Sequence, residues 1–109
     1  MPTTYKVLGQ SKPTAATATT LYTVPASTQT VVSSLLVTNL TNDPTTVNIA
    51  VRVAGAALED KQYIAYSNNL GGYSTRVYTL GITLGATDIV SIYDTTGKAS
   101  FSLFGSEIS

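Results

Sequence analysis

The chain has 109 residues, of which 43% are hydrophobic and only 11% are charged, and its formal net charge is zero. Disordered chains combine low hydrophobicity with high charge, so this composition predicts one folded domain with a hydrophobic core. The Lys and Arg residues are scattered, which argues against nucleic-acid binding, because phosphate recognition needs a basic cluster. A surface so poor in charge suits a protein that partners partly cover.

The chain contains no cysteine and no histidine. Disulfide and thiolate chemistry are therefore excluded, and so is the usual base of a nucleophilic triad. The N-terminus lacks the basic start and apolar run of a signal peptide, and no stretch approaches the roughly 20 apolar residues of a membrane span. We expect folding in a cytoplasm, no membrane partner and no cofactor.

The first 18 residues contain few large apolar side chains and two prolines. They predict an extended N-terminal arm (1–18) that precedes a β-sandwich domain (19–109). The arm is either a loose tail, since termini are often disordered, or a segment that lies on a neighbouring subunit. The anchors in the second case would be Tyr5, Val7 and Leu8.

From residue 20 onward, β-prone stretches alternate with turn signals. The clearest strand is "TTVNIAVRV". Its alternation predicts that Asn48 and Arg52 face outward and that the core-facing residues are Val47, Ile49, Val51 and Val53. The stretch "LTNDP" before it is a dense turn signal. The segment 54–61 is expected to be a loop or one helical turn. The expected strands are 20–24, 30–39, 45–53, 61–66, 73–84, 88–94 and 99–108.

The expected strand 30–39 does not alternate. Strict alternation places Ser34 and Leu36 on one side of "SSLLVTN" and Leu35 and Val37 on the other, so both sides carry bulky apolar groups. One side must pack into the core, and the other needs a cover. The outward side is assigned to Val31, Leu35 and Val37, to be covered either by the chain's own arm or by a neighbouring subunit.

About seven short strands, separated by turn signals every 8–12 residues, are typical of all-β folds. No stretch shows sustained helical periodicity. The fold class expected is therefore a single antiparallel β-sandwich, either jelly-roll-like or immunoglobulin-like. The order of the strands is left open.

The few carboxylates offer little chemistry. Glu59 and Asp60 are adjacent in a loop, which indicates a solvated turn, or alternatively a weak calcium site. Asp88 and Asp94 bracket one strand, as edge residues often do, although paired carboxylates can hydrolyse glycosidic bonds. We expect no enzyme activity, no catalytic residue and no metal ion.

Tyrosine is the most frequent aromatic residue, with seven copies. A tyrosine buries its ring while its hydroxyl stays wet, so it is common at core rims and at protein interfaces. Exposed tyrosines can also bind sugars. The four that fall in adjacent expected strands are Tyr63, Tyr66, Tyr73 and Tyr78.

Several stretches together resemble a family of small virion structural proteins of tailed bacteriophages, notably those of cyanobacteria. They are "YKVLGQ" (5–10), "LYTVPA" (21–26), "VVSSLLVTN" (31–39), "LGITLGATDIVSIY" (80–93) and "SFSLFGSEI" (100–108). The resemblance implies a non-enzymatic β-sandwich that assembles on the particle.

The function expected is that of a capsid decoration (cement) protein in the virion, assembled in the host bacterial cytoplasm. Its partners would be the major capsid protein or other virion proteins, and it would form a homo-oligomer, a trimer or a dimer. The alternatives are a tail, neck or fibre protein and, less favoured, a carbohydrate-binding module. The contact residues expected are Tyr5, Val7, Leu8, Val31, Leu35, Val37, Tyr63 and Tyr66.

Overall fold

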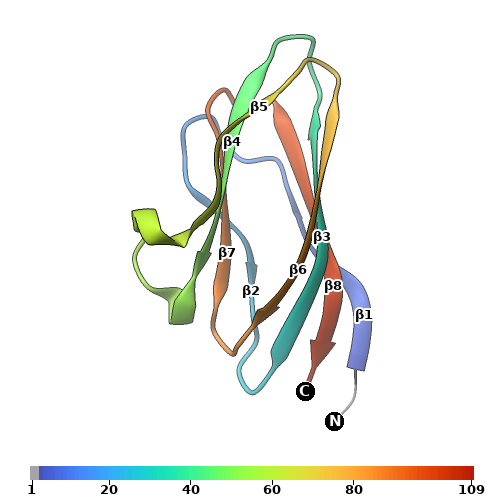
Figure 1. The fold of residues 1–109 in the computed structure, drawn as a ribbon, viewed down its shortest axis with the longest axis vertical. Coiled ribbons are helices and arrows are strands. Elements are labelled where there is room, and N and C mark those ends of the chain that lie inside the picture. Colours follow the sequence, from blue (N-terminus) through green and yellow to red (C-terminus); the bar gives the residue numbers. More distant parts are fainter. Residues whose placement is uncertain (1–2) are drawn as a thin grey trace.

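The computed structural model describes residues 3–109, which form two layers of strands (Figure 1). Two single turns of 3-10 helix, Val53–Gly55 and Asp60–Gln62, lie in the segment that was expected to be a loop or one helical turn. The strands are β1 (Thr3–Ser11), β2 (Thr19–Thr23), β3 (Gln29–Asn39), β4 (Thr45–Arg52), β5 (Tyr63–Leu70), β6 (Thr75–Leu84), β7 (Ile89–Asp94) and β8 (Ala99–Ile108).

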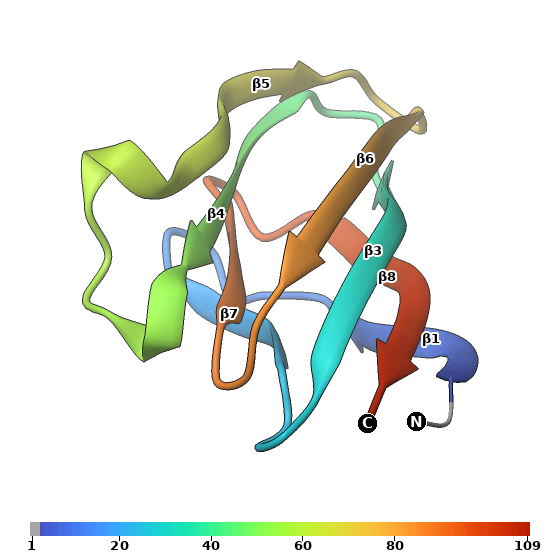
Figure 2. The ribbon, with the colours of Figure 1, turned by 60° about the horizontal axis from the view of Figure 1, so that its bottom comes forward.

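The strand order identifies the sandwich as a jelly roll. One sheet has the order β1-β8-β3-β6 and the other β2-β7-β4-β5, and every pair is antiparallel. The chain thus resembles one long hairpin in which β1 to β4 pair with β8 to β5 in turn and which is then rolled up. Figure 2 shows the resulting layers face to face. The predicted β-sandwich is confirmed, and of the two expected versions the jelly roll is correct.

The core lies between the two sheets. Phe101 and Leu103 of β8 are fully buried, and they face Ile49 of β4 and Ile92 of β7, which are also buried. These residues alternate with partly exposed ones along each strand, because successive side chains of a strand point to opposite faces. The alternation of "TTVNIAVRV" therefore indicated correctly which side of β4 packs inward. Its last residue is the exception, because Val53 lies in a 3-10 turn after the strand and is 67% exposed.

The strand β3 carries a β-bulge at Ser33. Its pairings with both β6 and β8 shift register between Val32 and Ser34. A bulge inserts one unpaired residue, so the inward side changes from even to odd numbers, and Val32 and Leu35 both face the core. Gly105 opposite the bulge permits it, since a Cβ there would lie 2.2 Å from the Val31 carbonyl oxygen.

The bulge overturns two of the predicted contact positions. Leu35 and Val37 are 0% exposed and belong to the core, so the expectation that they face outward is wrong. The expectation assumed that side chains alternate between the two faces all along 31–37, but the bulge at Ser33 breaks this alternation. Leu36 is the side chain that the second side presents to the surface.

The first strand is not a separate arm. Residues 3–11 are extended, but they form the edge strand β1 that pairs with β8 from Thr3–Ile108 to Ser11–Phe101. Leu8 is buried in the core rather than exposed as an anchor, and Gly9 lies so close to β2 that a Cβ would meet the Leu21 carbonyl oxygen at 2.3 Å. β1 is therefore part of the sandwich, which has eight strands in the described residues where the sequence predicted seven. Residues 1–2 of the expected arm lie outside the described residues.

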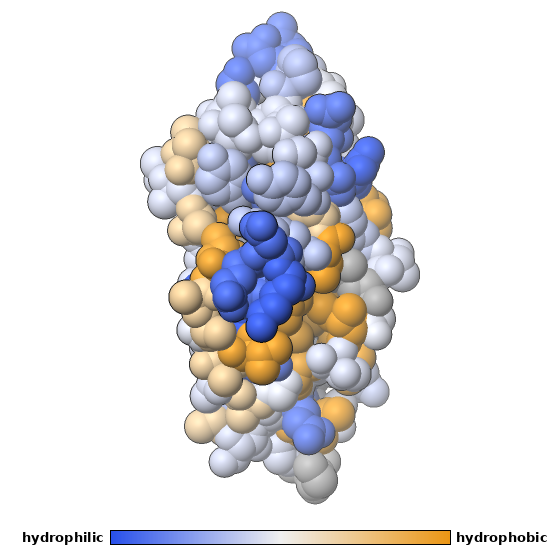
Figure 3. Space-filling model, turned by 60° about the vertical axis from the view of Figure 1, so that its left-hand side comes forward, coloured by the Kyte–Doolittle hydropathy of each residue, from blue (hydrophilic) through white to orange (hydrophobic). Residues whose placement is uncertain are grey.

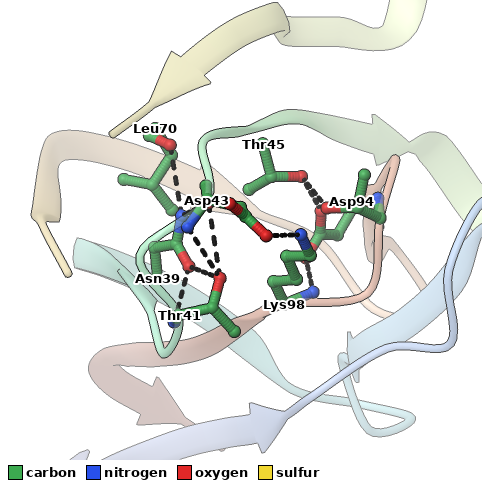
Figure 4. Close-up of polar contacts among 8 residues, drawn as sticks. Asn39, Thr41, Asp43, Thr45, Leu70, Asp94 and Lys98 are labelled. Carbon is green, nitrogen blue, oxygen red and sulfur yellow. Dashed lines mark hydrogen bonds and ion pairs between the residues drawn. The ribbon is translucent and has the colours of Figure 1, made fainter. Parts of the chain in front are cut away.

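A buried polar network closes one end of the sandwich (Figure 4). Asp94, which is 0% exposed, accepts hydrogen bonds from the Thr45 hydroxyl and from the backbone N–H groups of Lys98 and Ala99, the last two at 2.7 Å. Asn39, 1% exposed, donates to the Asp43 carbonyl oxygen at 2.7 Å. The side chains of these two residues hold the β3–β4 and β7–β8 turns in place.

A second polar network ties four strands together near the other end. The Glu107 carboxylate of β8 pairs with the Lys6 ammonium at 3.1 Å and accepts a hydrogen bond from the Tyr22 hydroxyl. That hydroxyl also lies 2.8 Å from the Thr30 hydroxyl. The hydrogen bond from Tyr22 and the charge of Lys6 lower the pKa of Glu107, whereas burial and the bond to Glu107 raise the pKa of Tyr22 to about 12.

Replacing Glu107 with glutamine is expected to remove about 1–2 kcal/mol of stability at pH 7, because hydrogen bonds to charged groups contribute more to stability than hydrogen bonds between neutral groups do. The pKa of Glu107 is lower in the folded protein than in the unfolded chain. The carboxylate therefore stabilises the fold fully at pH values above its unfolded-state pKa, and this stabilisation is lost as the pH falls through its folded-state pKa. Urea unfolding should therefore show the stability difference between the two proteins shrinking as the pH falls below about 4.3, the ordinary pKa of glutamate. A stability difference that is the same at all pH values would contradict this.

Candidate interaction surfaces

The first candidate surface is the outward side of the β1-β8-β3-β6 sheet. Burial alternates along β3 and along the first half of β8, and the register of β1 and β6 with these strands assigns the remaining side chains to this side or to the core side. None of the described side chains assigned to it is charged, and we call it the uncharged face. It comprises Tyr5, Val7, Gln10, Val31, Ser34, Leu36, Thr38, Thr75, Val77, Thr79, Thr83, Ser100, Ser102, Phe104 and Ser106.

Apolar side chains lie in register across this face. Val7 of β1 is paired with Phe104 of β8, and Leu36 of β3 is paired with Val77 of β6. The two outer members are well exposed, Val77 at 57% and Val7 at 47%. Serine and threonine hydroxyls occupy most of the positions between them, and the pair Thr38 and Thr75 lies 3.2 Å apart. The face is therefore uncharged and partly apolar.

The charged residues of these strands lie elsewhere. Lys6 and Glu107 pair with each other and reach Tyr22 of the opposite sheet, which places them toward the interior side. Arg76 is paired with the core residue Val37, so it occupies a position of the edge strand β6 on the core side of the sheet. By this placement, the charged residues of these four strands do not belong to the uncharged face.

The second candidate surface is on the opposite sheet, beneath the β4–β5 connection (53–62). This connection folds back over the outward side of β4 and β7, where it covers Ala50 and Ser91. Arg52 holds it by donating from Nε to the Ala56 carbonyl oxygen at 2.6 Å, and Gln62 donates to the Ala57 carbonyl oxygen at 3.0 Å. Figure 3 shows this side, with apolar surface around a hydrophilic projection.

A hollow of about 390 Å³ lies beside the connection, and we call it the tyrosine hollow. Tyr63 and Tyr66 meet at one side of it with ring centroids 4.8 Å apart and planes at 72°. Ser67 donates its backbone N–H to the Asn48 side-chain oxygen at 2.6 Å, across a register shift between β4 and β5. The residues that line the hollow are Ala18, Asn48, Leu58, Tyr63, Tyr66, Ser67, Tyr93 and Thr95.

The predicted contact residues separate into three groups. Tyr5, Val7 and Val31 lie on the uncharged face, and Tyr63 and Tyr66 line the tyrosine hollow. The remaining three, Leu8, Leu35 and Val37, are in the core.

The sequence reasoning missed Leu36, Val77 and Phe104 on the uncharged face. For Phe104 and Val77, alternation within "SFSLFG" and "TRVYT" was a signal that could have found them. For Leu36, no signal identified the bulge that places it there.

The carboxylates lie apart from one another. Asp94 belongs to the turn network described above, and Asp88 accepts hydrogen bonds from the backbone N–H groups of Ala54 and Gly85. Glu59 lies 3.8 Å from Lys61. Within residues 3–109, no group of three or more acidic residues could hold a metal ion. No helix in this part of the chain is long and apolar enough to cross a membrane.

No family model and no curated protein matches the chain. Among solved structures, it is similar to a chain in the structure of infectious bursal disease virus, Gx strain, with 14% sequence identity and a TM-score of 0.48. The match covers 97% of this chain but 31% of the viral one. The resemblance to virion proteins of tailed bacteriophages therefore stays a prediction.

Proposed function

We propose that the chain is a structural protein of a virus particle, and specifically a decoration protein that binds the outer capsid shell of a tailed bacteriophage. The observation that carries the proposal is the uncharged face. The resemblance of "VVSSLLVTN" and "SFSLFGSEI" to phage virion proteins adds to it, since these stretches form the two central strands of that sheet. The outer surface of the major capsid protein would cover the face.

The chemistry of the face supports a protein partner. Soluble proteins rarely leave contiguous apolar patches exposed, and such patches with polar rims mark interaction sites. The centre of an interface is depleted in charge, because a charge there must lose its hydration. Val7, Phe104, Leu36 and Val77 provide apolar area, while the hydroxyls between them can bond to a partner's backbone.

The size of the face supports attachment in many copies. Its strands have 9 to 11 residues. Four such strands give a face of roughly 30 Å by 19 Å, or about 600 Å². A stable protein interface buries about 800 Å² on each partner, so a single copy would bind weakly. A dimer or trimer would attach through several faces at once and gain from their effective concentration.

Replacing Val77 with lysine is expected to abolish or strongly weaken binding to capsids while the protein stays folded. The side chain is 57% exposed, so the new charge is harmless in the free protein but would have to be desolvated in the contact. The measurement is co-sedimentation of the purified variant with capsids that lack the protein. The matched control is Leu40→Lys, which changes a 49% exposed residue in the β3–β4 turn outside the uncharged face.

Quantitative mass spectrometry of purified virions separates a decoration protein from other virion proteins. A decoration protein should be present in hundreds of copies, whereas a tail, neck or fibre protein would be present in a few to dozens. A low copy number would overturn the capsid location, and wild-type binding by Val77→Lys would overturn the proposed face.

A further inference from the structure

We infer that the tyrosine hollow on the β2-β7-β4-β5 sheet is a binding site for a neutral carbohydrate, with a pyranose ring packed against Tyr66. The hollow is separate from the uncharged face, since the two lie on opposite sheets of the sandwich. The inference is therefore independent of the proposed capsid contact and concerns a second activity of the same chain.

The aromatic residues of the hollow provide the stacking surface. Tyr66 is 63% exposed, and the nearly perpendicular Tyr63 ring supports it from the side. The face of an aromatic ring carries partial negative charge, which attracts the weakly positive C–H groups on one side of a pyranose ring. A fixed, exposed ring with a second ring across the corner therefore suits a flat, polyhydroxylated ligand.

The polar groups of the hollow match sugar hydroxyls. Tyr22 and Tyr78 use their hydroxyls within the chain, on Glu107 and Asn68 respectively. The hydroxyls of Tyr63, Tyr66 and Tyr93, by contrast, have no hydrogen-bond partner within the described residues and are free for a ligand. The Asn48 oxygen is held by the Ser67 N–H, which leaves the amide NH₂ group as a donor.

The charges around the hollow favour a neutral ligand. None of the side chains that line it is charged. At its edge, Asp60 lines an adjoining hollow together with Tyr63 and Tyr66. A carboxylate can accept two hydrogen bonds from a vicinal diol, but it repels phosphate, sulfate and carboxylate groups. Neutral hexoses fit this arrangement better than nucleotides or uronic acids do.

The walls of the hollow are held in place before any ligand arrives. The β4–β5 connection that carries Leu58 is fixed by the hydrogen bonds of Arg52 and Gln62. The register shift that follows Tyr66 is held by Asn48, whose side-chain oxygen accepts a hydrogen bond from the Ser67 N–H group. A preorganised site loses little conformational entropy on binding, although a hollow this open should bind a single sugar only with millimolar affinity.

The test is a titration of the full chain, labelled with ¹⁵N, with the methyl glycosides of glucose, galactose, mannose and N-acetylglucosamine. We expect at least one sugar to cause saturable shifts in the backbone signals of Asn48, Ser67 and Thr95. The Tyr66→Ala variant should bind that sugar at least about tenfold more weakly. Tyr73→Ala is the matched control, because Tyr73 is 73% exposed but lies in the β5–β6 turn.

The inference would be overturned if none of the four sugars caused saturable shifts, or if Tyr66→Ala bound as tightly as the unmodified chain. It would also be overturned if Tyr73→Ala weakened binding equally, since that result would place the sugar elsewhere. Sugar binding is tested with Tyr66→Ala, and capsid binding is tested with Val77→Lys on the opposite sheet. Failure of the sugar site and failure of the capsid contact are therefore distinguished by different variants.

Discussion

Replacing Asp94 with alanine is expected to lower the free energy of unfolding by about 3–5 kcal/mol, because several hydrogen-bond donors lose their buried carboxylate acceptor at once. The carboxylate is fully buried and accepts hydrogen bonds from Thr45, Lys98 and Ala99. Each donor left without a partner costs about 1–3 kcal/mol, reduced where water can enter the β7–β8 turn. A loss of this size is a large part of the stability of a small domain.

The effect of Asp94→Ala can be measured by urea unfolding, with Asp43→Ala as the matched control. Asp43 is at the same end of the sandwich and pairs with the Lys98 ammonium at 3.0 Å, but its side chain is 68% exposed (Figure 4). An exposed ion pair contributes at most about 1 kcal/mol. Equal losses in the two variants would show that burial of the Asp94 network does not stabilise the fold.

The neighbouring residues Leu35 and Leu36 are expected to respond very differently to the same change. Leu35→Ala should cost about 2–5 kcal/mol, because it removes a fully buried side chain and leaves a cavity between the sheets. Leu36→Ala should cost about 1 kcal/mol or less, since Leu36 is only half-buried on the uncharged face. Chemical denaturation of both variants tests which side of β3 faces the core.

The two leucines also separate folding from assembly. Leu36→Asp should remain folded and lose capsid binding, whereas Leu35→Asp should not fold, because it places an unpaired charge in the core. Reversed losses of stability would mean that the bulge at Ser33 is absent and that β3 alternates strictly. In that case the outward positions would again be Leu35 and Val37.

The two candidate interaction surfaces differ in how far the sequence anticipated them. Tyr63 and Tyr66 were identified as contact residues because they are two aromatics in one β-prone stretch. That Tyr93 joins them depends on β4 lying between β5 and β7 in the sheet, a non-local arrangement that local patterns do not contain. Asn48 was read only as an outward-facing polar residue of its strand.

The amino-acid sequence by itself determined the strand content, the turns and the class of fold. Alternation in "TTVNIAVRV" and the turn signal "LTNDP" depend only on neighbouring residues, so they can be read locally. The low charge likewise predicts a surface that partners cover, and this stays a prediction. These features follow from side-chain type and spacing alone.

Only the tertiary structure decided which side of β3 is outside and that residues 3–11 belong to the sandwich. Both outcomes depend on partners far away in sequence, since the bulge at Ser33 forms against β6 and β8, and β1 pairs with the last strand of the chain. A single unpaired residue moves the following side chains to the opposite face. Leu35 therefore lies in the core, and Leu36 lies on the face that a partner would cover.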